Sequence, residues 1–493
     1  MKKAKAYWLS INLQLDKAFQ NSVLLWILFF AVLAGNLYYK FFFLQEMHLK
    51  NDDAFSVFYA QQSLSELYTQ LAKEANPPLY FTFLHFWIKL FGIGPIAVKS
   101  LSALFSVGAA LTIFAICKKH MDLLGAFTAS SLFLFSNVHF DFSHEVRAFS
   151  LVVFLCALSI YLFLNAIKEP KVKWLILLCI VNASLPYAHY TAVLLPLTEF
   201  LIAFSILISN RHSFFRITLS FIGSAVLFIP QLLNFSDTIP DDNFWLKKPS
   251  KSDLDYVFAR ITGHDPSHDL IINLLLIALV LSTIHFLYSI FTKEFDYKKQ
   301  LLFIAVFFVP ILLNYAIAQY TPVFRMRYML FAGLGVILGL SYLFTHIKLP
   351  ALLKMCLVVY LLVPFYKGFR PENRNYFRWD KAAKAVDQNY SANHVFLIHP
   401  AWRLNDFTYY FDRQSFRDYR NMHAIMEQKG FKTIYQANQI DLEENSSFTL
   451  LRRNLPNSEF AQNLIDRMKE MNYSLEESYY SDDEILIETW RSD

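Results

Sequence analysis

The hydrophobic pattern divides residues 22–366 into long apolar runs separated by short polar segments. A helix needs about 20 predominantly apolar residues to cross a bilayer, and about eleven runs approach that length. The first run has no small-residue cleavage site and is long for a signal peptide, so we interpret it as an uncleaved span. We expect spans near residues 22–44, 97–117, 123–140, 148–167, 173–189, 191–209, 214–234, 270–292, 301–319, 328–346 and 350–366. The pattern predicts a polytopic α-helical membrane protein.

The segment between the first two spans, residues 45–96, has a different pattern. Within it, an aromatic stretch from Pro77 to Phe91 is interrupted by His85 and Lys89. This stretch is too short to cross a bilayer comfortably, and its polar residues favour a helix that lies in the membrane interface. A further span is the alternative interpretation.

Basic and acidic residues lie on opposite sets of loops. Cytoplasmic loops of membrane proteins carry an excess of Lys and Arg. With the N-terminus in the cytoplasm, the cytoplasmic loops contain Lys118, Lys119, Lys168, Lys171, Lys173, Arg211, Arg216, Lys293, Lys298, Lys299 and Lys348. The opposite loops contain Asp52, Asp53, Glu66, Glu74, Asp141, Glu145, Asp237, Asp241 and Asp242. The two distributions therefore predict that residues 45–96 lie on the non-cytoplasmic side.

The character of the chain changes after residue 366. Charged residues become frequent, short β-like runs occur at residues 394–398, 448–451 and 484–488, and a helical repeat covers residues 458–471. We therefore divide the chain into a transmembrane domain, residues 1–366, and a soluble α/β domain, residues 367–493. An odd number of spans places this second domain on the non-cytoplasmic side.

Composition narrows the class of protein further. The 493 residues are 55% hydrophobic and 17% charged, with a net charge of only +5. No dense cluster of Lys and Arg indicates nucleic-acid binding. The four cysteines all lie inside apolar runs, so neither a disulfide framework nor a metal site is indicated.

Three short segments on the non-cytoplasmic side carry candidate chemistry. Asp52 and Asp53 follow the first span, and adjacent carboxylates there act as a base, bind a cation or stay solvated. Glu145 and Arg147 lie at the start of another span, where a local salt bridge that caps a helix is the simpler explanation. Arg325 and Arg327 precede the span near residues 328–346, and arginines at this depth either extend to lipid headgroups or bind phosphate.

These segments and three others resemble, in order, the motifs of the C-type (GT-C) glycosyltransferases. The resemblance is to the group that contains the protein O-mannosyltransferases and the bacterial aminoarabinose transferase of lipid A. The matching segments are Asn51–Phe55 (the external acidic motif), Glu74–Phe81 (acid-x-His-Pro-Pro-Leu-Tyr-Tyr), Lys99–Leu104 (Arg-Leu-Pro-Ser-Ala-Leu), Glu145–Leu151 (Glu-x-Arg-x-Tyr-x-Leu), Tyr187–Thr191 (Thr-His-Tyr) and Pro322–Tyr328 (the late Arg-Tyr motif). Four positions depart from these motifs, namely Asp53 for Glu, Asn76 for His, Lys99 for Arg and Phe149 for Tyr.

The resemblance implies an enzyme that moves a hexose or pentose from a polyprenyl phosphate to a hydroxyl of a glycolipid or protein, by inverting displacement. It implies that Asp52 is the general base, with Asp53 beside it. Arg327, with Arg325 and Arg147, would hold the phosphate leaving group. Further substrate contacts are expected from Glu74, Asn76, Glu145 and His189.

The implied reaction requires neither a cofactor nor a metal, because the lipid phosphate is itself a competent leaving group. We expect the bacterial inner membrane, with the active site and the C-terminal domain on the periplasmic side. The endoplasmic reticulum remains the alternative location. The sugar and the acceptor stay open.

A transporter or lipid flippase is the rival function. Coupled transporters place ionisable residues near the bilayer midplane, where this chain has only Glu199 and His285. A membrane-anchored scaffold is a third interpretation, which explains the C-terminal domain and leaves the many spans without a purpose.

Overall fold

The chain forms two compact units, each assembled from segments that are far apart in the sequence. The membrane unit comprises Met1–Leu44, Tyr68–Phe83 and Lys99–Arg370, and the sheet unit comprises Gln45–Leu67, Leu84–Val98 and Pro371–Asp493. The structure is a computed structural model that describes residues 22–42, 44, 48–49, 51–73, 76–207, 211–236, 247–262, 297–346, 378–391, 394–440, 447–455, 458–482 and 484–492.

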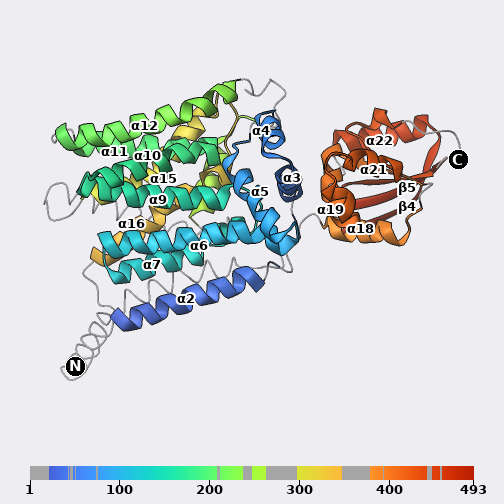
Figure 1. The fold of residues 1–493 in the computed structure, drawn as a ribbon. Coiled ribbons are helices and arrows are strands. Elements are labelled where there is room, and N and C mark those ends of the chain that lie inside the picture. The colour runs from blue at the N-terminus through green and yellow to red at the C-terminus, as the bar shows by residue number, and fades with distance from the viewer. Residues whose placement is uncertain are drawn as a thin grey trace. The chain divides into compact units, whose positions relative to one another are not determined.

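The membrane unit is built from apolar helices that run alongside one another (Figure 1). Its helices are α2 (Ser22–Phe42), α7 (Leu123–Leu134), α8 (Asn137–Phe142), α9 (Phe149–Lys168), α10 (Val172–Ala188), η1 (Tyr190–Val193), α11 (Leu194–Leu207), α12 (Arg211–Ser236), α13 (Lys251–Ile261), α15 (Tyr297–Ile317), η2 (Met326–Ala332) and α16 (Gly333–His346). Three further helices have residues in both units: α4 (Leu64–Lys73), α5 (Leu79–Phe91) and α6 (Pro95–His120). The chain is a multi-pass membrane protein, as its sequence predicts.

Within the described residues, five helical segments are long and apolar enough to cross a membrane. They are Pro95–His120, Phe149–Lys168, Arg211–Leu233, Lys298–Ile317 and Met326–His346. Five shorter apolar helices accompany them, including α5, whose 13 residues fall short of a full span. The expected spans at residues 270–292 and 350–366 lie outside the described residues.

One expected span is divided into two helices. The run at residues 123–140 forms α7 and α8, with a break at Ser136, whose backbone is extended (φ −64°, ψ 114°). The polar pair Ser136 and Asn137 follows ten consecutive buried residues of α7. These two polar residues end the apolar run, and the chain turns there.

The helices of the membrane unit differ in how deeply they are buried. α9 is central in the membrane unit, because 78% of its most apolar stretch is buried. The corresponding stretch of α12 is only 17% buried. Apart from Arg211 and His212 at its start, the exposed side chains described for α12 are apolar, for example Phe215, Ile222 and Leu233. A continuous apolar face of this kind suits lipid and would be unfavourable in water.

The sheet unit contains a mixed five-stranded sheet in the order β2-β1-β3-β5-β4. Its strands are β1 (Val395–His399), β2 (Phe431–Thr433), β3 (Ser447–Arg453), β4 (Tyr473–Asp482) and β5 (Ile485–Ser492). β1 pairs in parallel with β2 and β3, whereas β5 pairs antiparallel with β3 and β4. The C-terminal α/β fold expected from the alternating pattern is therefore confirmed.

Helices cover both faces of this sheet. The other helical elements of this region are α18 (Trp379–Gln388), η4 (Ala401–Arg403), α19 (Leu404–Phe411), α20 (Arg413–Arg417), α21 (Met422–Gln428), η5 (Ala437–Gln439) and α22 (Glu459–Glu470). Alternate residues of a strand point to opposite faces, and β1 shows this clearly. Leu397 joins a core with Leu464 of α22, whereas Phe396 stacks on Phe431, which contacts Phe407 of α19.

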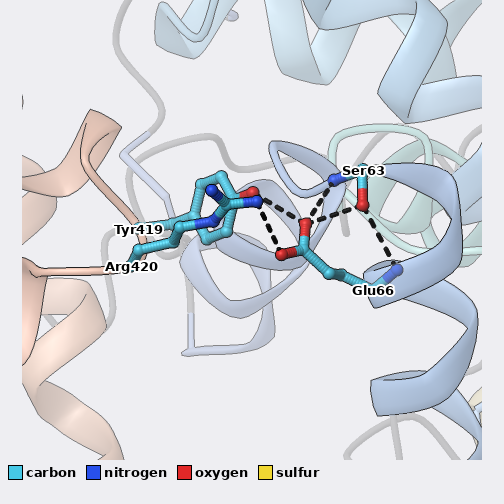
Figure 2. A network of polar contacts seen from close by, with 4 residues as sticks. All are labelled: Ser63, Glu66, Tyr419 and Arg420. Carbon is cyan, nitrogen blue, oxygen red and sulfur yellow. Dashed lines mark hydrogen bonds and ion pairs between the residues drawn. The ribbon is translucent and has the colours of Figure 1, made fainter.

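The sheet unit also includes residues 45–67 and 84–98, which precede most of the membrane helices in the sequence. α3 (Asn51–Ala60) packs on α19, and the rings of Phe58 and Phe416 lie 5.8 Å apart. Beside them, Glu66 of α4 accepts hydrogen bonds from the Tyr419 hydroxyl and the Arg420 guanidinium, both at 2.8 Å (Figure 2). Residues 45–67 and 84–98 thus belong to the same compact unit as the C-terminal sheet.

Candidate functional site

Asp52 and Asp53 lie in the first turn of α3, within the sheet unit. Carboxylates are favourable at this position, because the N-terminal end of a helix carries partial positive charge. The hydroxyl of Ser56 donates to the carbonyl of Asp52 at 2.9 Å and fixes this first turn. Asp52 is half-buried, whereas Asp53 is only 1% exposed.

A third carboxylate, Asp406 of α19, belongs to the same environment. Asp406 is 2% exposed, and its Oδ2 accepts a hydrogen bond from Nη1 of Arg403 at 3.0 Å. Burial raises the pKa of Asp406 to about 7; Arg403 opposes this rise, and Asp52 and Asp53 add to it. Asp52 and Asp53 therefore lie close enough to act electrostatically on an acid that follows them by about 350 residues.

The second group of candidate residues lies in the membrane unit. Arg147 directly precedes Ala148, the residue that caps α9 without a side-chain hydrogen bond. Its Nη2 donates to Oδ1 of Asn76 at 3.3 Å, and its guanidinium lies 5.8 Å from the ring of Phe81. The guanidinium and the uncapped N-terminus of the helix both carry positive charge. This position therefore favours binding of an anion.

Arg327 and His189 meet around two aromatic rings. Arg327 lies 5.7 Å from the ring of Phe149 and 5.5 Å from that of Tyr328. The ring of His189 lies 4.6 Å from Tyr328 and 6.2 Å from Phe149. Thr191 joins these segments, since its hydroxyl donates to the carbonyl of Tyr328 at 3.1 Å.

The two arginines act on the same histidine. The charges of Arg147 and Arg327 both act on the half-buried His189. The fixed positive charge of this region comes from the two guanidinium groups. We call Asn76, Arg147, His189 and Arg327 the arginine cluster.

An apolar cavity of about 560 Å³ borders the arginine cluster. This volume lies within the range of about 300–1,000 Å³ that is usual for ligand pockets. Asn76, the partner of Arg147, lines the cavity, as do Tyr190 and Gln231, which share a hydrogen bond of 2.9 Å. Its remaining lining is largely apolar and comes from α4, α5, α10 and α12. The cavity therefore has a polar end beside a guanidinium and apolar walls beyond it.

The remaining expected site residues are placed differently. Arg325 is exposed and acts on Asp253, whose pKa is lowered mainly by its hydrogen bonds with Ser250 and only slightly by Arg325. Glu145 lies half-buried in the segment before Arg147. Glu74 lies outside the described residues.

Sequence reasoning missed two features of these groups. Asp406 and Arg403 carry no motif and follow the aspartates of α3 by about 350 residues. Phe149 and Tyr328 lie within two of the matching motifs, but their contacts with Arg327 were not predicted. The alternation of arginine with aromatic residues in these motifs was the signal that could have indicated them. Cation–aromatic contacts of this kind orient a guanidinium.

Two comparisons bear on the family. The sequence model of the family described as dolichyl-phosphate-mannose-protein mannosyltransferase matches residues 75–233, a segment that contains Asn76, Arg147 and His189. The predicted resemblance to the GT-C glycosyltransferases is confirmed. No curated protein sequence matches the chain.

One solved structure shows a similar fold over most of the chain. ArnT from Cupriavidus metallidurans, bound to undecaprenyl phosphate, superposes with a TM-score of 0.55 at 10% identity, covering 94% of this chain and 97% of ArnT. The oligosaccharyltransferase of Archaeoglobus fulgidus is also similar, with a TM-score of 0.39 at 10% identity, over 82% of this chain and 63% of that one. The likeness to ArnT shows an ArnT-like membrane fold with a C-terminal mixed sheet.

Proposed function

We propose that this protein transfers a sugar from a polyprenyl-phosphate donor to a hydroxyl acceptor by inverting displacement. The observation that carries the proposal is the arginine cluster, where Arg147 and Arg327 both act on His189 beside an apolar cavity. A lipid phosphate needs this combination, with cationic groups for its head and apolar walls for its chain. The undecaprenyl phosphate bound to ArnT is a ligand of this chemistry.

The arginines have a defined role in this reaction. As the bond between the anomeric carbon and the phosphate oxygen breaks, negative charge develops on the leaving phosphate. Fixed guanidinium groups stabilise that charge, and planar donors match phosphate oxygens well. Phe149 and Tyr328 hold Arg327 in place, and Asn76 orients Arg147.

Asp52 is the general base of the proposed reaction. It removes the proton from the acceptor hydroxyl as the oxygen attacks the anomeric carbon. Asp52 is half-buried, so its carboxylate is partly desolvated and still open to a substrate. Asp53 is almost fully buried and is better suited to support Asp52 than to contact the acceptor.

Further substrate contacts belong to the proposal. Glu74 and Glu145 would bind hydroxyls of the sugar or acceptor, and Arg325 would add positive charge on the same side. The positive-inside distribution puts these groups on the non-cytoplasmic face, which is the periplasmic face if the chain resides in a bacterial inner membrane. We divide the chain functionally at residues 366/367, although the sheet unit also takes in part of the first external loop.

The transporter alternative receives no support from the described residues. Glu199 is enclosed by Ser159 and Asn182, and it does not line the cavity beside the arginine cluster. His285 lies outside the described residues. Charge gathered at the ends of the helices suits an interfacial enzyme better than a transport path.

The test combines ligand binding with donor turnover by purified full-length protein in detergent. Undecaprenyl phosphates carrying a hexose or an aminopentose are offered with a membrane extract as acceptor. We expect wild type to release undecaprenyl phosphate, Asp52→Asn to lose at least about 100-fold in turnover while still binding the donor, and Arg327→Gln to weaken both.

The matched control for Asp52→Asn is Asp387→Asn, at an exposed aspartate of α18, which should keep wild-type turnover. A wild-type protein that binds no undecaprenyl phosphate and turns over no donor would exclude the proposed function. Full activity of Asp52→Asn would move the role of base to another carboxylate.

A further inference from the structure

Two lysines lie over the same tryptophan ring at one end of the membrane helices. Nζ of Lys119, in the last turn of α6, lies 4.9 Å from the centroid of the Trp174 ring, and Nζ of Lys173 lies 4.5 Å from it. The two ammonium nitrogens are therefore less than about 10 Å apart, within one Debye length at 0.1 M salt. Tyr161 of α9 completes the group, with its ring 5.3 Å from Nζ of Lys119 and 6.3 Å from the ring of Trp174. We call Lys119, Tyr161, Lys173 and Trp174 the basic–aromatic patch.

The polar atoms of the basic–aromatic patch are donors that remain open to a ligand. Lys119 and Lys173 are exposed, and neither forms an ion pair with an acid in the described part of the chain. Trp174 and Tyr161 are half-buried, and no described residue accepts a hydrogen bond from the indole Nε1 or the phenol hydroxyl. Two ammonium groups, an indole N–H and a hydroxyl thus gather without an acceptor among the described residues, and an anion would satisfy them.

The acids that neighbour these lysines in the sequence have partners of their own. Glu169 lies 2.7 Å from Lys171, and Asp122 caps the start of α7. The carbonyl end of α6 is compensated separately, because Nζ of Lys299 donates to the carbonyl of His120 at 3.0 Å. The positive charge of the basic–aromatic patch is therefore not consumed by these neighbouring groups.

The surface of α10 beside the basic–aromatic patch indicates what kind of anion fits. Ile176 and Leu177 follow Lys173 by three and four residues, so they lie on the same face of α10, one turn deeper in the helix. Both side chains are exposed and apolar. One continuous face thus presents positive charge at the end of a membrane helix and an apolar surface next to it. A phospholipid, with a charged phosphate above its acyl chains, has the same order of groups.

We propose that the basic–aromatic patch binds an anionic phospholipid, with its phosphate between Lys119 and Lys173 and an acyl chain along Ile176 and Leu177. The indole N–H and the tyrosine hydroxyl donate to headgroup oxygens, at the membrane depth where Trp and Tyr are favoured. The bound phosphate relieves the repulsion between the two ammonium groups.

This site is separate from the one proposed for the donor. None of the four residues of the basic–aromatic patch lines the cavity beside the arginine cluster. Lys119 and Lys173 also belong to the segments that the charge distribution predicts to be cytoplasmic, whereas the candidate catalytic residues belong to the opposite set of loops. The inference therefore goes beyond the proposed function and does not depend on it.

The first experiment measures lipid binding to the purified full chain by native mass spectrometry. The probes are phosphatidylglycerol and phosphatidylcholine with the same acyl chains, because only phosphatidylglycerol carries a net negative charge. We expect wild type to bind phosphatidylglycerol at least about tenfold more tightly, and the double variant Lys119→Gln/Lys173→Gln to lose most of this preference.

The matched control is Lys247→Gln/Lys248→Gln, which removes the same charge from the same unit. Both of these lysines are exposed, and neither has an aromatic contact among the described residues. This control should keep the preference of wild type for phosphatidylglycerol. An equal loss in the two double variants would mean that the preference reflects net charge alone and would overturn the inference.

A further variant separates the arrangement of the patch from its charge. Trp174→Leu keeps both lysines but removes the ring that they share and its N–H donor. We expect phosphatidylglycerol to bind this variant about three- to fivefold more weakly than wild type, at an unchanged net charge. Wild-type affinity in Trp174→Leu would contradict the assigned role of the ring.

Two other outcomes would also overturn the inference. Equal affinity of wild type for the two lipids would show that the site does not recognise a net negative charge. If glycerol phosphate, a soluble analogue of the headgroup, bound as tightly as phosphatidylglycerol, the ligand would be a soluble anion and not a lipid. All of these measurements report binding, so failure of the proposed donor turnover would leave them unaffected.

Discussion

Buried polar side chains of the membrane unit hydrogen-bond between helices, and the group around Glu199 is an example. Glu199 is fully buried among α9, α10 and α11, with Ser159 Oγ 2.9 Å from both of its carboxyl oxygens. Ser159 also lies 2.5 Å from Oδ1 of Asn182, whose amide donates to Glu199 at 3.3 Å. The single hydroxyl proton of Ser159 can serve only one of its three acceptors. The hydrogen-bond count therefore favours the neutral acid form of Glu199, which supplies a further proton.

This count leads to a prediction at the residue scale. Glu199→Gln should keep wild-type donor turnover and change stability by less than about 1 kcal/mol, because an amide replaces the neutral acid in shape and donor capacity. Glu199→Leu should lower the thermal midpoint in detergent, since Ser159 and Asn182 lose their partner. Loss of turnover in the glutamine variant, at unchanged stability, would instead mean that Glu199 exchanges protons during function.

At the scale of the element, a glycine allows two membrane helices to approach closely. α15 and α16 cross at Gly335, where a Cβ atom would lie 2.6 Å from the backbone N of Phe307 and 2.9 Å from its Cβ. Helices in a membrane gain stability from packing at small residues, because lipid is as apolar as their side chains. α16 follows η2 directly, so this crossing also determines where Arg327 lies.

Gly335→Ala is therefore expected to separate α15 from α16 and cost about 1–3 kcal/mol. The displacement should reach the arginine cluster, so binding of undecaprenyl phosphate should weaken together with the thermal midpoint. Gly339 is the matched control on the same helix, because its added Cβ would make only an ordinary contact at 3.7 Å with Phe303. Equal effects of the two alanine variants would argue against the close crossing as the cause.

Elements with a strong local pattern were predictable from the sequence. The apolar runs gave helices such as α9 and α12 within a few residues of their bounds, and the alternating runs gave β1, β3 and β5. The break at Ser136 was missed, because apolar residues continue on both sides of it. Local periodicity reports which face is buried and contains little information about where a buried helix turns.

At the scale of the whole molecule, the prediction of the site was less complete. The motifs identified Asn76, Arg147, His189 and Arg327, which the structure brings together within the membrane unit. They did not indicate that α19, which carries Asp406, packs on α3, since nothing local connects positions so far apart. The expected boundary at residues 366/367 divides the chain once. The sheet unit, however, contains residues from before and after this boundary.

This assembly predicts the effect of truncation. A chain that ends after residue 370 would leave Leu49, Phe58 and Glu66 without Tyr410, Phe416 and Arg420. We expect limited proteolysis within residues 45–67 to become at least about tenfold faster than in the full chain, because local opening is no longer opposed. Cleavage after Lys118 or Lys119, in the last turn of α6, serves as the internal control and should not change. Equal protection of residues 45–67 in both proteins would contradict the assembly.

The distance along the chain between α3 and its partners has a consequence for biosynthesis. The bond from Leu49 to Tyr410 joins residues 361 positions apart. At about 5–20 residues per second, translation of the intervening chain takes on the order of half a minute. During that time α3, which carries the two aspartates, has already been synthesised. The residues on which its apolar face packs have not yet been translated. The catalytic base of the proposed enzyme is thus among the last parts of the molecule to be put in place, after most membrane helices have been inserted.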